Sequence, residues 1–523
     1  MICVSLGRGR HRMMMADHLE LSREGVPLVE LRLDYIRRAV EIKRLLAERP
    51  TPVVVTARRP SDGGKWRGSE RDRVMLLRSA VAEGADYVDL EMDVAGQIPR
   101  YGKTKRIVSY HNFRETPADL ESLHRSMSEL DADIVKIATM ANDPHDNLRV
   151  LRLCRDAKVP TVAFCMGEIG TPSRLLCGRF GAPFTYATFS DERQLAPGQL
   201  SWRTMRKLYR YDSIGPNTQV FGVVADPVAH SLSPLVHNRG FRLLDLDAVY
   251  LPFRVPKEHF REFVADAREL GIRGLSVTIP HKEEAIRCAT TPESEVVGIR
   301  AANTLLFEPD GRIVAANTDA PAAIASLAKA FDPTGSVERP LAGKRALLLG
   351  TGGVARALAW GLARAGADVS ISGRNFEHAE RLAKDFDARA VDWVAKHSVR
   401  PDLVVNCTPV GMHPHVDESP FEKQFLKSHM VVFDTVYNPE QTLLIKHARE
   451  LECRVVTGTE MFVRQAVLQF ERFTGRKLSK RQTLEQVRRA ISAVRYDEDE
   501  NGSPTPAPTA SPSESGPTDP VET

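Results

Sequence analysis

The sequence predicts an α/β protein: an N-terminal (β/α)8 TIM barrel, followed by a two-lobed α/β unit whose second lobe has a Rossmann fold. Three observations lead to this prediction. The 523 residues are too many for one hydrophobic core, and a chain of this length has about three domains. Strand-like and helix-like patterns alternate along most of the chain, which favours parallel sheets. A glycine-rich turn at residues 350–355 joins an apolar strand to a helix.

Residues 1–210 contain eight strand-like apolar runs, and amphipathic or charged stretches separate most of them. The runs are Ile2–Leu6, Pro27–Leu33, Pro52–Ala57, Ala85–Met92, Arg106–Tyr110, Asp133–Thr139, Pro160–Met166 and Pro183–Thr188. Helical stretches include 71–83, 118–130 and 144–157. Eight strands that alternate with helices in about 200 residues are typical of a compact (β/α)8 barrel. A doubly wound open sheet is the alternative.

The pattern resets near residues 209–218, which indicate a short linker. We expect a first, substrate-binding lobe over residues 218–330 and the Rossmann lobe over residues 340–460. Residues 461–495 are largely helical, and we expect them to return to the first lobe and complete it. Residues 497–523 are rich in Pro, Ser, Thr, Asp and Glu and nearly lack apolar residues, so they are predicted to be a disordered tail.

The composition is that of an ordinary globular protein, with 42% apolar and 27% charged residues. A net charge of +4 is too weak to indicate binding to nucleic acid or to a membrane surface. The seven cysteines form no CxxC pair and no Cys/His spacing typical of metal sites, so we expect reduced thiols and no metal. With no signal segment and no long apolar window, we expect a soluble cytoplasmic protein of uncertain oligomeric state that acts on small molecules.

Lys136 lies in the segment 132–140, which otherwise resembles a buried parallel strand. Burial removes water from an ammonium group, so the neutral amine becomes available to form an imine with a bound ketone. A lysine that extends to solvent from a strand end is the alternative. Other polar residues at predicted strand ends favour the imine: Glu30, Arg32, Arg58, His111, Arg174 and Gln199. An amine, an imidazole and guanidinium groups around one opening suit a small anionic ketone that loses a proton beside its carbonyl.

These residues resemble the active site of type I 3-dehydroquinate dehydratase, over the whole of residues 1–210. The resemblance implies that Lys136 forms a Schiff base with the substrate and that His111 is the general base and acid. Asp62 stands where the family has a glutamate that supports this histidine, and Leu195 stands where it has a small hydroxyl residue. The resemblance also implies that Glu30, Arg32 and Arg58 surround the substrate hydroxyls. It places Arg174 at the substrate carboxylate and Gln199 on the loop that closes the site.

The glycine turn of the second half consists of Gly350, Thr351, Gly352, Gly353, Val354 and Ala355. Its place between strand and helix is what a dinucleotide pyrophosphate needs, because the backbone approaches closely and the phosphates meet a helix N-terminus. At the end of the next strand no carboxylate stands where one would bind the ribose of NAD. Arg374 stands there, with His378 one turn later, and both suit a 2′-phosphate. We therefore expect NADP(H), although a surface arginine is the alternative for Arg374.

Four short polar clusters lie upstream of the turn, at 231–233, 276–282, 302–304 and 317–319. Each alone could be turn chemistry. In this order and spacing they resemble shikimate dehydrogenase, from about residue 218 to 494. The resemblance implies a catalytic pair, Lys282 and Asp319. It also implies substrate contacts from Ser231, Ser233, Ser276, Thr278, Asn303 and Gln465, and cofactor contacts from the turn, Asn406, Thr408, Val436, Gly458 and Met461.

The two implied activities are consecutive, since the product of the first, 3-dehydroshikimate, is the substrate of the second. We therefore expect a bifunctional enzyme that resembles fused dehydratase–dehydrogenases and converts 3-dehydroquinate to shikimate with NADPH. A metabolite-sensing regulator without chemistry is one alternative, and the presence of all four catalytic residues argues against it. A dehydrogenase that prefers quinate is another, and Ser233 favours shikimate.

Overall fold

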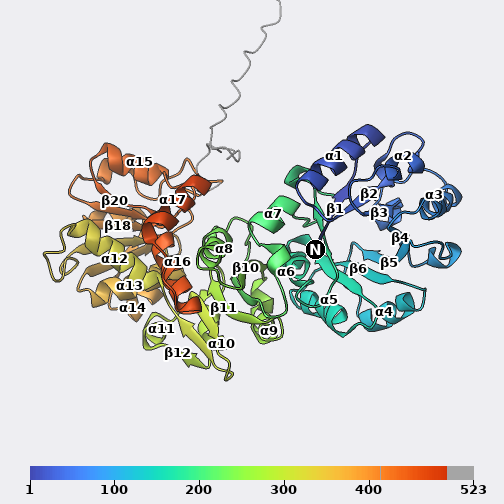
Figure 1. The fold of residues 1–523 in the computed structure, drawn as a ribbon. Coiled ribbons are helices and arrows are strands. Elements are labelled where there is room, and N and C mark those ends of the chain that lie inside the picture. The colour runs from blue at the N-terminus through green and yellow to red at the C-terminus, as the bar shows by residue number, and fades with distance from the viewer. Residues whose placement is uncertain (413, 492–523) are drawn as a thin grey trace, which may run out of the picture.

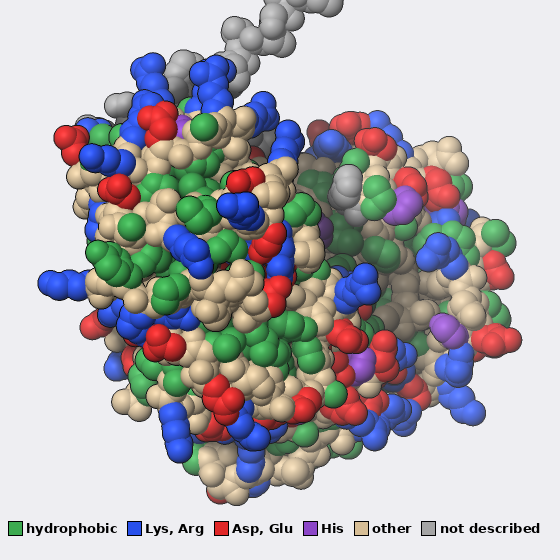
Figure 2. All heavy atoms as spheres, turned by 90° about the vertical axis from the view of Figure 1, so that its right-hand side faces the viewer, with side chains coloured by type: hydrophobic (Ala, Val, Ile, Leu, Met, Phe, Trp, Pro, Cys, Tyr) green, Lys and Arg blue, Asp and Glu red, His purple; other side chains and the backbone are tan. Residues whose placement is uncertain are grey.

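The computed structural model describes residues 1–412 and 414–491, so the predicted tail, 497–523, and residues 492–495 lie outside the described residues. The chain forms two bodies side by side, an N-terminal half that runs from blue to blue-green and a C-terminal half that runs from green to red (Figure 1). Acidic and basic side chains are interspersed over the face in Figure 2, without a large area of one sign. Within the described residues, no helix is long and apolar enough to cross a membrane.

The N-terminal half is a nearly closed parallel barrel. Its strands are β1 (Ile2–Leu6), β2 (Leu28–Arg32), β3 (Val53–Thr56), β4 (Tyr87–Glu91), β5 (Lys105–Asn112), β6 (Ile134–Met140), β7 (Thr161–Met166) and β8 (Thr185–Thr188). They pair in the order β7-β6-β5-β4-β3-β2-β1-β8, with every pair parallel. Because β1 pairs with both β2 and β8, the sheet curls round on itself. The predicted barrel is confirmed, and the doubly wound open sheet is wrong.

Helices cover the outside of the barrel. They are α1 (His11–Arg23), α2 (Ile42–Leu46), α3 (Glu70–Ala82), α4 (Leu120–Ser128), α5 (His145–Asp156), α6 (Gly167–Leu176) and α7 (Trp202–Lys207). Side chains of Ser69, Asp119 and Ser201 accept hydrogen bonds at the N-termini of α3, α4 and α7, which supplies partners for otherwise free backbone N–H groups.

Alternation along β6 explains how a lysine comes to lie inside the barrel. Val135 and Ile137 belong to the large core between strands and helices, whereas Ile134 and Ala138 belong to a smaller apolar cluster inside the barrel. Successive side chains of a strand point to opposite faces, so Lys136 shares the inner face with Ile134 and Ala138.

The C-terminal half begins with a mixed sheet. Its strands are β9 (Gln219–Ala225), β10 (Ala248–Arg254), β11 (Ile272–Val277), β12 (Thr291–Pro292), β13 (Thr304–Phe307) and β14 (Ile313–Ala316), in the order β10-β9-β11-β13-β14-β12. Its helices are α8 (Ser233–Leu243), α9 (Phe260–Asp266), α10 (Lys282–Cys288) and α11 (Ser294–Ile299). Strand β13 runs antiparallel to β11 and β14. The β13–β14 connection, residues 308–312, is too short for a parallel crossover and forms a hairpin instead.

Helix α12 (Asp319–Phe331) leads into a second sheet in which every pair is parallel. Its strands are β15 (Arg345–Leu349), β16 (Asp368–Gly373), β17 (Arg389–Asp392), β18 (Leu403–Asn406), β19 (Val431–Asp434) and β20 (Arg454–Val456). The order β17-β16-β15-β18-β19-β20 is that of a Rossmann fold. Helices α13 (Gly353–Arg364), α14 (Phe376–Asp385) and α15 (Leu443–Glu450) connect the strands. The predicted Rossmann lobe is confirmed.

The last two described helices, α16 (Gly458–Thr474) and α17 (Lys480–Ile491), leave the Rossmann sheet and pack on α8. One apolar cluster joins Val236 of α8 to Phe462 of α16 and Val487 of α17. The hydroxyl of Thr457 accepts a hydrogen bond at the N-terminus of α16. Segments far apart in the sequence therefore share one core (Figure 1).

Two candidate active sites

The first cavity lies at the carboxyl ends of the barrel strands, the end that carries the chemistry in barrels of this type. It brings together all eight residues proposed for the first site from the sequence: Glu30, Arg32, Arg58, Asp62, His111, Lys136, Arg174 and Gln199. Leu195 also lines it. Side chains from strands far apart in the chain thus meet in one place.

Lys136 remains inside the barrel, with only 6% of its side chain exposed. Its Nζ atom lies 3.0 Å from Asp89 Oδ2, 3.9 Å from Glu30 Oε1 and 4.0 Å from the centre of the Tyr186 ring. Two carboxylates therefore approach this amine, an arrangement that the residue pattern did not anticipate. The amine attacks a ketone only in its neutral form.

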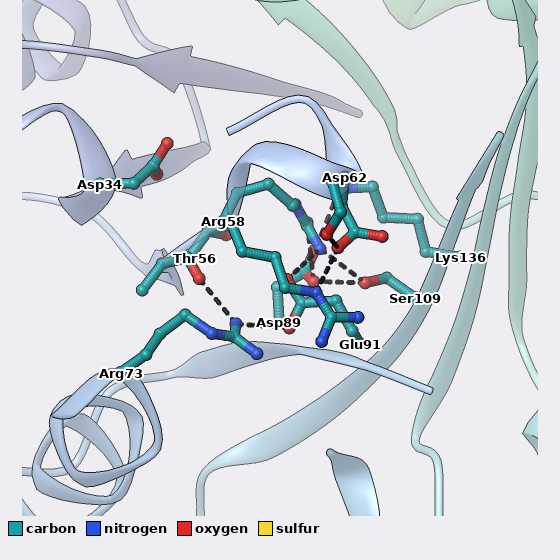
Figure 3. Close-up of polar contacts among 12 residues, drawn as sticks. Asp34, Thr56, Arg58, Asp62, Arg73, Asp89, Glu91, Ser109 and Lys136 are labelled. Carbon is teal, nitrogen blue, oxygen red and sulfur yellow. Dashed lines mark hydrogen bonds and ion pairs between the residues drawn. The ribbon is translucent and has the colours of Figure 1, made fainter. Parts of the chain in front are cut away.

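A charged network at the end of β4 holds one wall of the cavity (Figure 3). Arg58 lies 2.8 Å from Asp89 and 2.9 Å from Glu91, and it also donates to Ser109 at 3.0 Å. Arg73 approaches the other oxygen of Glu91 at 2.6 Å. Although burial opposes ionisation, Arg58 and Lys136 hold the pKa of Asp89 well below its usual range. Asp89 is therefore a charged member of this network, and it lies behind Arg58, which lines the cavity.

Sequence reasoning missed Asp89 and Glu91, yet a signal was present. They alternate along β4 as Asp-Leu-Glu, just as Glu30 and Arg32 alternate along β2. Charges two residues apart in an apolar strand share a face and need partners there.

His111 lies on the same inner wall, at the end of β5. Burial, followed by the charges of Arg58 and Lys136, lowers the pKa of His111 well below its usual value. The imidazole is therefore neutral, which is the form a general base needs. Asp62 lines the cavity but pairs with Arg59, and in the part of the chain that the structure describes no hydrogen bond joins Asp62 to His111.

Arg174 is the unusual charge of this cavity, because it is 1% exposed and has no carboxylate partner among the described residues. Its guanidinium lies 4.3 Å from the centre of the Phe164 ring and donates one long hydrogen bond, 3.4 Å, to the carbonyl of Pro197. Burial lowers the pKa of Arg174 to about 10. A buried, uncompensated cation is costly, so the cavity is suited to an anionic group.

Gln199 holds the loop over this cavity. Its Oε1 atom accepts hydrogen bonds from the backbone N–H groups of Leu195 (2.8 Å) and Ala196 (3.3 Å). We call residues 195–199 the lid.

The second cavity, about 140 Å³, lies between the mixed sheet and the Rossmann lobe. Among the residues proposed from the sequence it is lined by Ser231, Ser233, Ser276, Thr278, Lys282, Asn303, Asp319, Val354, Gly458, Met461 and Gln465. The Nζ atom of Lys282, at the start of α10, lies 2.6 Å from Asp319 Oδ2, at the start of α12. Both side chains are less than a tenth exposed. They form a buried ammonium–carboxylate pair facing the cavity.

Sequence reasoning missed six residues that line this cavity: Val223, Val277, Thr435, Tyr437, Phe462 and Gln469. Gln469 accepts a hydrogen bond from Ser276 at 2.8 Å and donates to the carbonyl of Asn303 at 2.8 Å. Ser276 also accepts from the Tyr250 hydroxyl at 2.6 Å. Gln469 follows Gln465 by one helical turn on α16, and that spacing places both on one face.

Asn303 serves partly to shape the loop before α12. Its amide donates to the Thr318 hydroxyl at 2.9 Å, and its carbonyl accepts from the Thr318 backbone N–H at 2.8 Å. These bonds position Asp319, the next residue.

The glycine turn meets the conditions for binding a pyrophosphate. Gly350 has φ of +117°, and a Cβ there would lie 2.8 Å from the carbonyl oxygen of Cys407. Gly352 precedes α13 without a side-chain cap, and a Cβ there would meet open space. The first N–H groups of α13 therefore remain available to an anion. A Cβ on Gly353 would lie 3.0 Å from Lys282 Cδ, so the turn adjoins the ammonium–carboxylate pair.

The other residues proposed for the cofactor lie around this turn. Ala355 is buried on α13. Asn406 accepts from Thr408 and donates to Asp434 at 2.9 Å, and a Cβ on Gly458 would lie 2.2 Å from the Val436 carbonyl oxygen. Arg374 and His378 are exposed beyond β16 and do not line the cavity. The end of β16 nevertheless contacts the turn, since a Cβ on Gly373 would lie 2.9 Å from Thr351.

Four protein families match successive parts of the chain. Their descriptions are type I 3-dehydroquinase (residues 2–216), shikimate dehydrogenase substrate binding domain (223–305), NADP oxidoreductase coenzyme F420-dependent (345–436) and shikimate 5'-dehydrogenase C-terminal domain (458–488). A solved structure, shikimate 5-dehydrogenase from Thermus thermophilus in complex with NADP(H) and shikimate, is 33% identical. The match covers 52% of this chain and 99% of that one, with a TM-score of 0.47.

Two curated relatives extend these matches. Shikimate dehydrogenase (NADP(+)) of Methanothermobacter thermautotrophicus is 39% identical over 269 residues, 50% of this chain and 92% of its own. The chloroplastic bifunctional 3-dehydroquinate dehydratase/shikimate dehydrogenase of Arabidopsis thaliana is 38% identical over 472 residues, which cover 86% of this chain and 78% of the relative. With one match running through both cavities, this chain belongs to the family of bifunctional 3-dehydroquinate dehydratase/shikimate dehydrogenases.

Proposed function

We propose that the protein carries out two consecutive steps of the shikimate pathway: dehydration of 3-dehydroquinate to 3-dehydroshikimate, then reduction of that ketone to shikimate with NADPH. Membership of the bifunctional family supports both steps. The observation that carries the first step is the unpaired, buried guanidinium of Arg174 in the cavity that also holds Lys136 and His111. Such a cavity is built for an anionic ketone.

In the dehydratase site, Arg174 pairs with the substrate carboxylate and places the ketone at Lys136. After the ammonium has passed its proton to a neighbouring base, the amine attacks the ketone carbon and water leaves as the imine forms. The imine withdraws electrons from the adjacent carbon, and neutral His111 takes a proton from that carbon.

His111 then returns the proton to the departing hydroxyl, which leaves as water and gives the conjugated imine. Water hydrolyses the imine, releases 3-dehydroshikimate and frees Lys136. One water is used and two are released, so the net reaction is loss of one water. Arg58 is held by Asp89 and Glu91, which positions it for a substrate hydroxyl.

In the reductase site, Ser231 and Ser233 bind the substrate carboxylate, and Asp319 orients the Lys282 ammonium toward the ketone oxygen. Lys282 gives a proton to that oxygen as negative charge develops there. NADPH bound at the glycine turn supplies the hydride. We propose that Arg374 and His378 interact with its 2′-phosphate, because Arg374 stands directly after β16, where a carboxylate would favour NAD.

All seven cysteines are unpaired, which supports a reducing compartment, and we propose the cytoplasm. For substrate preference, Ser233 in the cavity favours shikimate over quinate.

Borohydride trapping tests the dehydratase proposal. Reduction in the presence of 3-dehydroquinate should fix the imine as a stable adduct on Lys136, located by peptide mass mapping. Lys136→Arg is the matched control and should give no adduct. An adduct at another lysine, or none in the wild type, contradicts the mechanism. Ultraviolet absorbance of the enone, recorded with 3-dehydroquinate alone, separates an enzyme from a sensor that binds without reacting.

A further inference from the structure

The two halves meet where α5 and α6 of the barrel contact α9 and β10 of the C-terminal half. Arg254, the last residue of β10, crosses this seam. Its Nη1 atom lies 2.9 Å from Glu168 Oε2 in the barrel, and its Nε atom lies 2.9 Å from Asp226 Oδ1 in the C-terminal half. One guanidinium therefore joins two carboxylates from different domains, and each carboxylate adjoins loops of a different active site.

On the barrel side, Glu168 follows the glycine that supports the lid. The backbone N–H of Gly167 donates to the Pro197 carbonyl at 3.2 Å, and a Cβ on Gly198 would lie 2.5 Å from the Gly167 carbonyl oxygen. Gly167 and Gly198 have φ of +80° and +70°, a region that favours glycine. The lid therefore rests on the first turn of α6, where Glu168 lies.

The carboxylate of Glu168 is paired with Arg254 through one of its oxygens, Oε2. Its second carboxylate oxygen, Oε1, is buried and has no hydrogen-bond partner among the described residues. Loss of the guanidinium would leave a partly buried carboxylate uncompensated and favour a shift of the first turn of α6.

On the other side, Asp226 joins two loops of the reductase site. It follows β9 at the start of the loop that carries Ser231 and Ser233. Its backbone N–H donates to the carbonyl of Ile279 at 3.2 Å, in the segment that leads to Lys282. Arg254 thus pairs with the carboxylate of Asp226, the residue that joins the loop of Ser231 and Ser233 to the segment before Lys282.

We propose that Arg254 is a positioning residue shared by the two active sites: it fixes the lid support of the dehydratase and the substrate loops of the reductase. The proposal rests on the proposed function. The side chains of Arg254, Glu168 and Asp226 are 39%, 33% and 28% exposed, and ion pairs so exposed contribute little to global stability. The effect of Arg254 is therefore on loop placement and is seen in KM more than in kcat.

The test compares Arg254→Ala, Glu168→Gln and Glu269→Gln in separate steady-state assays of the two reactions. Glu269 is the matched control, because it pairs with Arg152 and Arg155 across the same seam but lines neither cavity. Arg254→Ala should raise both KM values roughly threefold to tenfold with kcat nearly unchanged, which is the result of losing binding that substrate and transition state share equally. Glu168→Gln should raise only the dehydratase KM, and Glu269→Gln neither.

Unchanged KM values in Arg254→Ala, or equal shifts in Glu269→Gln, would overturn shared positioning. A wild type that lacks both activities would instead overturn the proposed function. Should Arg254→Ala fail to fold, Arg254→Lys replaces it. An ammonium keeps the charge but lacks the planar fork that reaches both carboxylates, so at least one KM should still rise.

Discussion

The substitution Arg174→Met tests two effects of the unpaired guanidinium. In the free protein the guanidinium lowers the stability of the barrel, and in the complex it binds the substrate carboxylate. Lowering of the Arg174 pKa from its ordinary value to about 10 corresponds to roughly 3 kcal/mol by which burial disfavours the charge. The contact with the Phe164 ring returns roughly 0.5–2 kcal/mol of this. A neutral methionine of similar length should therefore stabilise the barrel by about 1–2 kcal/mol, which raises its melting midpoint by roughly 2–8 °C.

Substrate binding should change in the opposite direction. Loss of one partner of a buried charge pair costs about 2–5 kcal/mol, so KM for 3-dehydroquinate should rise between about thirtyfold and several thousandfold. Calorimetry without ligand gives the first quantity, and enone absorbance gives the second. Arg58→Met is the control: its guanidinium is paired with Asp89 and Glu91, so the substitution should destabilise the barrel by about 3–5 kcal/mol. A lower midpoint in Arg174→Met, or an unchanged KM, would refute the reasoning.

Three other substitutions test the C-terminal half. Lys282→Met should lower kcat of NADPH oxidation by roughly 10²–10⁴ while enone formation persists, and loss of both activities would contradict separate sites. Arg374→Ala should reduce the kcat/KM preference for NADPH over NADH about tenfold to a hundredfold, and an unchanged ratio would place the 2′-phosphate elsewhere. Burial raises the pKa of Asp434 to about 6. Between about pH 4 and 6 the folded protein then binds more protons than the unfolded chain. Its free energy of unfolding therefore falls by about 3 kcal/mol as the pH rises through that interval, and this contribution is constant above it. Asp434→Asn should remove this dependence in denaturant unfolding measured from pH 4 to 7, and a dependence that persists in the variant would refute the assignment to Asp434.

The barrel was predictable because its strands are short apolar runs bounded by charged helices, and alternation along β6 and β2 placed Lys136, Glu30 and Arg32 inside it. The pairing of these charges was not predictable, since the partner of Lys136 lies on β4 and depends on how the strands are brought together.

Local side-chain geometry was a second feature that could not be predicted from the sequence. Asp62 lies in a short turn, where it pairs with Arg59, and no sequence pattern distinguishes that pairing from a bond to His111. In the C-terminal half, Tyr250 and Ser276 are brought into contact because β10 and β11 both flank β9.

The return of α16 and α17 to α8 has a consequence for synthesis. The side chain of Gln486 on α17 donates to the carbonyl of Leu235, 251 residues earlier in the chain. At the ordinary pace of translation, about 5–20 residues per second, that interval lasts roughly 10–50 s. During this time the helices that cover the apolar face of α8 around Val236 have not yet all been synthesised, whereas every strand of the barrel has already been made. The second half is therefore the part of the nascent protein that exposes an apolar face until the last described helices, α16 and α17, have been made.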